Sequence, residues 1–123
     1  MNCKSAFAVV AVLAPLAATG CQSVSQLDQK PPTWTAVYQA NWEHMANCIV
    51  QRQQRPLLTV TPTFSAGRAR IVVTNPTGAV MGTFDVRQIQ GNATEVAYRS
   101  IYGGPTTDAG SDAKDISDRC ARP

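Results

Sequence analysis

An apolar run near the start of the chain constrains the fold most, because it removes those residues from the folded domain. Residues Ser5 to Ala18 carry almost no polar side chain, and Lys4 is the one charge before them. These 14 residues are too few to span a hydrocarbon core about 30 Å thick. One positive charge, a short apolar run and small residues after it are typical of a secretory signal. Excluding residues 1–20 from the 123 leaves 103 residues, which is enough for one domain.

The apolar run ends in the stretch Ala18-Thr19-Gly20-Cys21. This stretch resembles the lipobox of bacterial lipoprotein precursors, in which a cysteine follows small residues at the cleavage point. The resemblance implies that signal peptidase II cuts before Cys21 and that the Cys21 thiol carries a diacylglyceryl group. Two or three acyl chains hold a protein durably at a membrane, because each buried methylene contributes about 0.8 kcal/mol. The alternative is ordinary secretion with a free Cys21.

The residues after Cys21 predict a location and a domain organisation. Gln22 stands where aspartate would retain an enteric-type lipoprotein at the inner membrane, so the resemblance implies the outer membrane, on its periplasmic side. Residues 21–33 are polar and contain Pro31-Pro32, so they are predicted to form a flexible tether that reaches about 20 Å from the lipid. Residues 34–123 are predicted to form a single domain.

The charge of the chain excludes some classes of partner. Without Lys4, ten basic and eight acidic side chains remain, and no basic cluster is visible along the sequence. A nucleic-acid partner is therefore not expected. Electrostatic attachment to a membrane surface is not expected either, which leaves the lipid on Cys21 as the predicted contact with the membrane.

The four cysteines divide into three groups. Cys3 leaves with the signal, and Cys21 takes the lipid if the resemblance holds. Cys48 and Cys120 then remain as one pair in an oxidising compartment, and a disulfide between them is the simplest interpretation. The alternatives are a metal site, which needs more ligands than His44 can add, and a reactive thiol, which needs a basic neighbour.

The first predicted element of the domain is a helix over residues 34–54. Trp34, Tyr38, Trp42, Met45 and Ile49 recur at spacings of four and three residues, which is one face of a helix. A threonine at position 33 or 35 could cap this helix, and a proline at position 56 would end it.

After Pro56 the period changes to two, which predicts four strands over residues 57–64, 68–75, 79–89 and 93–102. Pro62 lies inside the first of these runs and suggests an edge strand. Asn75-Pro76-Thr77-Gly78 and Gly91-Asn92 are turn signals between later runs. Short strands joined by tight turns predict an antiparallel meander.

Residues 103–112 have the composition of a loop, and Ser111 or Asp112 could cap a short last helix that presents Cys120. The predicted fold class is therefore α+β. We expect an N-terminal helix packed on a four-stranded antiparallel meander sheet, a short C-terminal helix, and one disulfide.

Two groups of side chains are candidates for partner binding. Trp34, Tyr38 and Trp42 either cover the sheet as core residues or form an aromatic groove for a peptide, a glycan or a lipid chain. The arginines on the predicted strands either make a solvated outer face or form a positive face that meets an acidic partner. These arginines are Arg68, Arg70, Arg87 and Arg99.

Catalytic and metal chemistry are not predicted. Glu43 and His44 are neighbours on a predicted helix, so their side chains point about 100° apart and cannot share a proton. The aspartates near the C-terminus are the ligand type that Ca²⁺ prefers, but their spacing matches no calcium-binding loop. We therefore expect no enzyme activity, no metal and no cofactor apart from the covalent lipid on Cys21.

The predicted function is that of a non-enzymatic envelope lipoprotein, an adaptor or accessory subunit that binds another envelope protein. The alternative is an inhibitor that projects the loop Pro105–Gly110, or a carrier of small apolar ligands with a cavity near Trp34 and Trp42.

Overall fold

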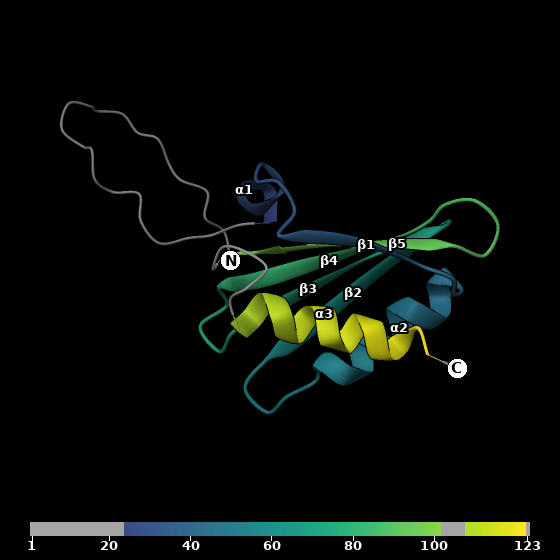
Figure 1. Ribbon diagram of the computed structural model, residues 1–123. Coiled ribbons are helices and arrows are strands. Elements are labelled where there is room, and N and C mark those ends of the chain that lie inside the picture. Colours follow the sequence, from purple (N-terminus) through teal and green to yellow (C-terminus); the bar gives the residue numbers. More distant parts are fainter. Residues whose placement is uncertain (1–23, 102–107, 123) are drawn as a thin grey trace.

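The computed structural model describes residues 24–101 and 108–122, arranged as a sheet with helices on both sides (Figure 1). The predicted signal, the lipid attachment site Cys21 and positions 105–107 of the candidate inhibitor loop lie outside the described residues. The elements in chain order are α1 (Val24–Asp28), β1 (Trp34–Tyr38), α2 (Trp42–Gln53), β2 (Thr59–Ser65), β3 (Arg68–Thr74), β4 (Val80–Gln88), β5 (Thr94–Ser100) and α3 (Asp108–Cys120).

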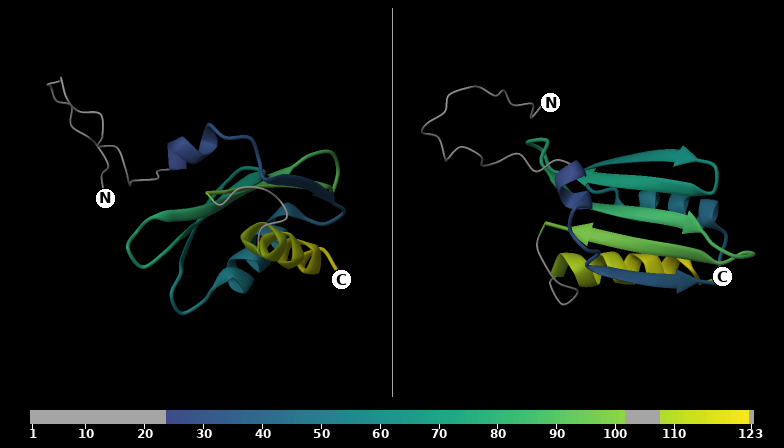
Figure 2. Two further views of the ribbon diagram at one scale, coloured as in Figure 1. Left: turned by 60° about the vertical axis from the view of Figure 1, so that its left-hand side comes forward. Right: turned by 90° about the horizontal axis from the view of Figure 1, so that it is seen from above.

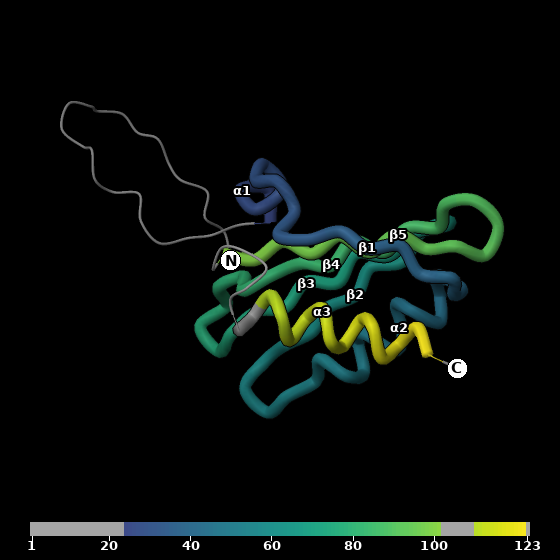
Figure 3. The backbone as a smooth tube through the Cα atoms, viewed as in Figure 1, coloured from purple at the N-terminus to yellow at the C-terminus, as the bar shows by residue number. Residues whose placement is uncertain are grey.

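The sheet has five strands in the order β1-β5-β4-β3-β2, and every neighbouring pair is antiparallel. Strands β2 to β5 follow one another as hairpins, whereas β1 pairs with β5 at the far edge. The chain runs from β1 through α2 into β2, so α2 connects the two opposite edges of the sheet (Figure 3).

The prediction of a four-stranded sheet under a helix at residues 34–54 is wrong, because the first part of that segment is β1. Residues four apart share a face in a strand as well as in a helix, so the spacing of Trp34, Tyr38 and Trp42 does not distinguish the two. The period within residues 34–38 is in fact two, with Thr35 and Val37 exposed between half-buried neighbours. Pairing of the backbone with β5 decides the outcome.

Helix α2 begins at Trp42, eight residues later than the predicted helix, and a cap at Asn41, which was not predicted, sets this start. The side-chain Oδ1 of Asn41 accepts hydrogen bonds from the backbone N–H groups of Glu43 (2.9 Å) and His44 (3.1 Å). Asparagine is among the preferred N-cap residues because it satisfies N–H groups that have no partner inside the helix.

The core lies between the sheet and the layer formed by α2 and α3. Met45 and Ile49 of α2, Ile116 of α3, and Ile71 and Phe84 of the sheet are buried in one cluster. The rings of Phe84 and Tyr98 have centroids 4.8 Å apart. Tyr98 lies so close to Gly82 that a Cβ at Gly82 would be 2.7 Å from the tyrosine oxygen, so the strand needs glycine there.

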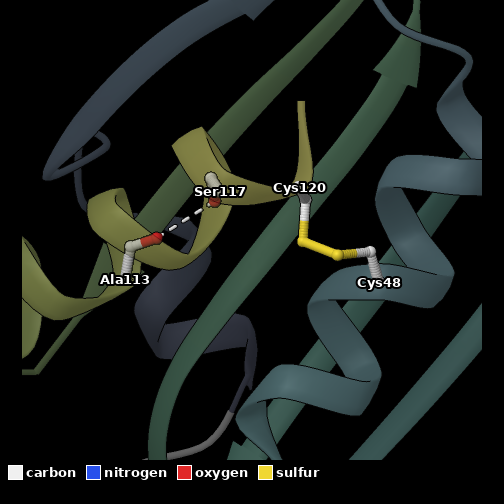
Figure 4. The surroundings of a disulfide bond; sticks show 4 residues. All are labelled: Cys48, Ala113, Ser117 and Cys120. Carbon is white, nitrogen blue, oxygen red and sulfur yellow. Dashed lines mark hydrogen bonds between the residues drawn. A yellow bond between two sulfur atoms is a disulfide. The ribbon is translucent and has the colours of Figure 1, made fainter. Parts of the chain in front are cut away.

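A disulfide between Cys48 and Cys120 joins α2 to the last residue of α3 (Figure 4). The two Cα atoms are 5.7 Å apart, within the usual range for this bond. On α3, the Ser117 hydroxyl donates a hydrogen bond to the Ala113 carbonyl oxygen at 3.0 Å, which satisfies a fully buried polar group. Helix α3 also starts at Asp108 and has 13 residues, so the last positions of the predicted loop are helical.

Residues 24–33, which were predicted to belong to a flexible tether, pack against the folded domain. Helix α1 lies on the side of the sheet opposite α2 and α3 (Figure 2). Its Leu27 side chain is fully buried. Asp28 pairs with Arg70 of β3 at 2.8 Å, and the Arg99 side chain donates to the Lys30 carbonyl oxygen at 2.9 Å. The segment that could act as a tether therefore ends at residue 23.

Candidate functional site

The face of the sheet that points away from α2 and α3, here called the outer face, is the first candidate surface. Helix α1 covers part of it, and no other helix of the described residues lies on this face (Figure 2). Along β3 and β5, side chains on this face alternate with buried ones. All four arginines proposed from the sequence lie on it, because each of them alternates with a buried neighbour: Arg68, Arg70, Arg87 and Arg99.

Two of these arginines are held inside an ion-pair network centred on Asp85. Arg70 donates to both carboxylate oxygens of Asp85 at 2.9 Å, and Arg99 donates to one of them at 3.2 Å. Hydrogen bonds to Asp85 and then to Asp28 raise the pKa of Arg70 above its usual value. Arg70 and Arg99 therefore hold α1 to the sheet, and they are poorly placed to meet a partner.

The other two arginines stand at the uncovered end of the outer face. Arg68 of β3 and Arg87 of β4 are directly opposite each other in the register, and both are exposed. Arg87 pairs with Glu95 of β5 at 2.7 Å. No partner for the Arg68 side chain is found in residues 24–101 or 108–122.

The aromatic candidates lie on the opposite side of the sheet and do not meet the arginines. The Trp34 ring stacks on Tyr98 with centroids 5.7 Å apart, and its Nε1–H donates to the Gly110 carbonyl oxygen at 3.0 Å. Trp42 lies apart from these residues, with its ring 6.3 Å from Phe64 at the β2 edge. The three aromatic candidates therefore form no single groove.

Tyr38, Lys114 and Asp118 form a polar cluster that was not predicted from the sequence. The Tyr38 hydroxyl donates to Asp118 at 2.7 Å, and Lys114 pairs with the same carboxylate at 2.8 Å. The Lys114 ammonium lies 5.9 Å from the ring centroids of both Trp34 and Tyr38. The spacing of four residues between Lys114 and Asp118 could have predicted their ion pair on a helix, but nothing in the sequence predicts their contact with Tyr38 of β1.

A hollow of about 280 Å³ lies beside this cluster. Its lining combines one aromatic ring with four polar or charged residues: Trp34, Ser111, Lys114, Asp115 and Asp118. This composition suits a polar or charged group of a partner better than the small apolar ligand of the alternative hypothesis. We refer to it below as the Trp34 hollow.

Asp118 should make the stability of the domain depend on pH in acid. Burial alone would raise the pKa of Asp118, but hydrogen bonds from Lys114 and Tyr38 and the charges of Lys114 and Arg122 lower it overall. The folded state therefore favours the carboxylate, and its stabilising effect is complete above the unfolded pKa of about 3.9 and is lost as the pH falls through the lower folded value.

We expect Asp118→Asn to destabilise the domain by about 0.5–1 kcal/mol at pH 7 and by less at pH 3, since the pair is half exposed. Urea unfolding at both pH values measures this difference. Asp115→Asn removes the same charge from the same helix and serves as the control. Equal losses for Asp118→Asn at pH 7 and pH 3 would contradict the assignment.

The comparisons with known proteins identify no family. No protein-family model matches the chain, and no curated protein matches it in sequence. In the part of the chain that the structure describes, no three His, Cys, Asp or Glu side chains gather as metal ligands do. Within the same residues, no helix combines the length and apolarity needed to cross a membrane.

Proposed function

We propose that the chain is a lipid-anchored protein of the bacterial envelope, a non-enzymatic adaptor that binds another envelope protein. The observation that carries the proposal is the stretch Ala18-Thr19-Gly20-Cys21 at the end of a short apolar run. Gln22 after the cysteine favours the outer membrane as the site of anchoring, on the periplasmic side.

The position of α1 limits how far the domain can stand from the membrane. Cys21 precedes the first residue of α1, Val24, by three positions. A fully extended chain spans about 3.5 Å per residue, so the Cα atoms of these two residues are at most about 10 Å apart. The lipid therefore holds the domain close to the bilayer, at about half the 20 Å expected for a long tether.

The same geometry favours the side of α2 and α3 as the surface for a protein partner. Helix α1 lies on one side of the sheet, and α2 and α3 lie on the other (Figure 1). Because the chain leads from α1 to the proposed anchor, the side of α3, which lines the Trp34 hollow, is expected to be directed away from the anchor. Lys114, Asp115 and Asp118 line this hollow beside a half-buried tryptophan, and although they pair within the domain, their side chains remain 38–53% exposed to a partner. Tryptophan at a partly desolvated site is a frequent source of binding energy at protein interfaces.

We expect Cys21→Ala to release the protein from the membrane fraction. The measurement is flotation of membranes from a Gram-negative host that expresses the full-length chain, with mass spectrometry of the mature N-terminus. Nearly all of the unaltered protein should float and carry a diacylglyceryl-sized mass on Cys21. A Ser23→Ala variant keeps the cysteine and serves as the control. Flotation of Cys21→Ala at the level of the unaltered protein would disprove the anchor.

The partner surface is tested separately by photo-crosslinking in intact cells. A photoreactive amino acid at Ser111, which lines the Trp34 hollow, is compared with one at Thr61 on the exposed β2 strand. We expect a discrete crosslinked protein from position 111 that disappears in the Lys114→Glu variant. The same products from both positions, or an adduct unaffected by Lys114→Glu, would exclude this surface.

A further inference from the structure

Two arginines lie directly opposite each other on the outer face, and only one acidic side chain of the described residues pairs with them. Arg68 and Arg87 are register partners of β3 and β4. Like charges at directly opposite positions of an antiparallel pair destabilise a sheet. Glu95 binds Arg87 at 2.7 Å, and the Arg87 side chain nevertheless keeps 53% of its surface exposed. The pair is therefore left with unused hydrogen-bond donors that an external anion could take.

The charge balance of the outer side of the domain is positive. Five basic groups belong to it: the four arginines, and Lys30, whose backbone carbonyl oxygen accepts a hydrogen bond from Arg99. Three acidic groups oppose them, namely Asp28, Asp85 and Glu95. The difference is two positive charges. Asp28 and Asp85 neutralise Arg70 and Arg99, so the excess positive charge belongs to Lys30 and the Arg68–Arg87 pair.

This surplus lies on the side of the sheet from which the chain leads to Cys21. Helix α1 lies on the outer face, and its last residue, Asp28, pairs with the side chain of Arg70 at 2.8 Å. The Cα atom of Arg70 is two residues along β3 from that of Arg68, about 7 Å. A bilayer that holds a lipid on Cys21 therefore lies on the side of the basic groups. Guanidinium groups present a planar fork of donors that matches the oxygens of a phosphate.

We propose that Arg68 and Arg87, together with Lys30, bind the phosphates of anionic lipid headgroups in the bilayer that carries the anchor. The contact turns the sheet toward the membrane and the α2–α3 side away from it. The inference rests on the proposed lipid anchor. It replaces the expectation from net charge alone that electrostatics play no part at the membrane, because the fold gathers on one side charges that are scattered along the sequence.

The described residues contain two lysines, one on each side of the sheet, so their relative reactivity reports which side faces the membrane. Lys30 is on the outer side, and Lys114 is on α3 on the opposite side. The full-length lipidated protein is incorporated into vesicles of phosphatidylcholine, with or without phosphatidylglycerol. An amine-reactive reagent then modifies both lysines, and mass spectrometry gives the ratio of modification at Lys30 to that at Lys114.

Each basic side chain that engages the lipid should favour the membrane-facing orientation of the sheet about fivefold, so anionic vesicles should lower this ratio. Salt at 1 M should restore it, since the Debye length is then about 3 Å. Arg68→Gln with Arg87→Gln should remove most of the protection and leave only the contribution of Lys30. Arg52→Gln with Arg122→Gln, which removes two exposed arginines from the helical side, should leave it intact.

An equal ratio in neutral and anionic vesicles would overturn the inference, and it would point to an acidic protein as the ligand of the arginine pair. Equal loss of protection in both double variants would overturn it too, because the effect would then reflect total charge. Flotation with neutral vesicles reports the lipid anchor independently. A protein that fails to float with them disproves the proposed function, whereas one that floats without protecting Lys30 disproves this inference alone.

Discussion

Replacing Cys48 and Cys120 together with alanine should lower the free energy of unfolding by about 4 kcal/mol. The disulfide closes a loop of 72 residues, and the cost of closing a loop of that length in the unfolded chain is about 4 kcal/mol. The covalent bond links α2 to the end of α3, so both helices of the core layer depend on it. A domain of this size has a total stability of about 5–15 kcal/mol, so the loss is a large fraction of the whole.

Urea unfolding of the oxidised protein and the double-alanine variant measures the effect. The unaltered protein, measured under reducing conditions, is the matched control, because it loses the bond without a change of side chain. It should unfold at nearly the same urea concentration as the variant. A difference below about 1 kcal/mol between the oxidised protein and the variant would show that the bond contributes little to the fold.

Leu27→Ala should destabilise the domain by about 2–4 kcal/mol, the range for truncating a buried leucine. Leu27 is fully buried although it lies on a five-residue helix near the start of the domain. Thr83, on the outer face, is also fully buried, and within the described residues its hydroxyl has no hydrogen-bond partner. Such burial indicates that α1 excludes water from the face it covers, so shortening Leu27 leaves a cavity there.

Gln29→Ala is the control for this prediction, because Gln29 is exposed just after the same helix. Its change in unfolding free energy should stay within about 0.5 kcal/mol. If Leu27→Ala is as mild as Gln29→Ala, then residues 24–33 behave as the flexible tether expected from the sequence, and the limit of about 10 Å on the distance from the anchor no longer holds.

Four of the five strands coincide with runs of alternating apolar and polar residues, because a half-buried strand imposes that period on its own sequence. The turn between β3 and β4 was also predicted, from Asn75-Pro76-Thr77-Gly78. In the structure the Asn75 side chain accepts hydrogen bonds from the Thr77 and Ala79 N–H groups. β1 was not visible, because five residues with aromatic side chains four apart fit a strand and a helix equally well. Its partner, β5, is some 60 residues distant in the chain.

The candidate site shows the same division between local and distant information. Arginines at alternating positions could be assigned to one face from the sequence, because register within a strand is local. Their division into two held by Asp85 and two left at the surface depends on Asp28 and on the pairing of β3, β4 and β5. The Tyr38 cluster likewise joins residues 80 positions apart.

The sequence by itself determined what depends on neighbours along the chain: the resemblance to a lipidation signal, the alternating strands, and the two cysteines left to pair. Only the tertiary structure decided that residues 34–38 form an edge strand, that residues 24–33 pack on the sheet, and that the arginines and aromatics lie on opposite sides. The physical reason is that each of these outcomes depends on backbone pairing or burial between segments far apart in the chain, where local propensity is too weak to decide.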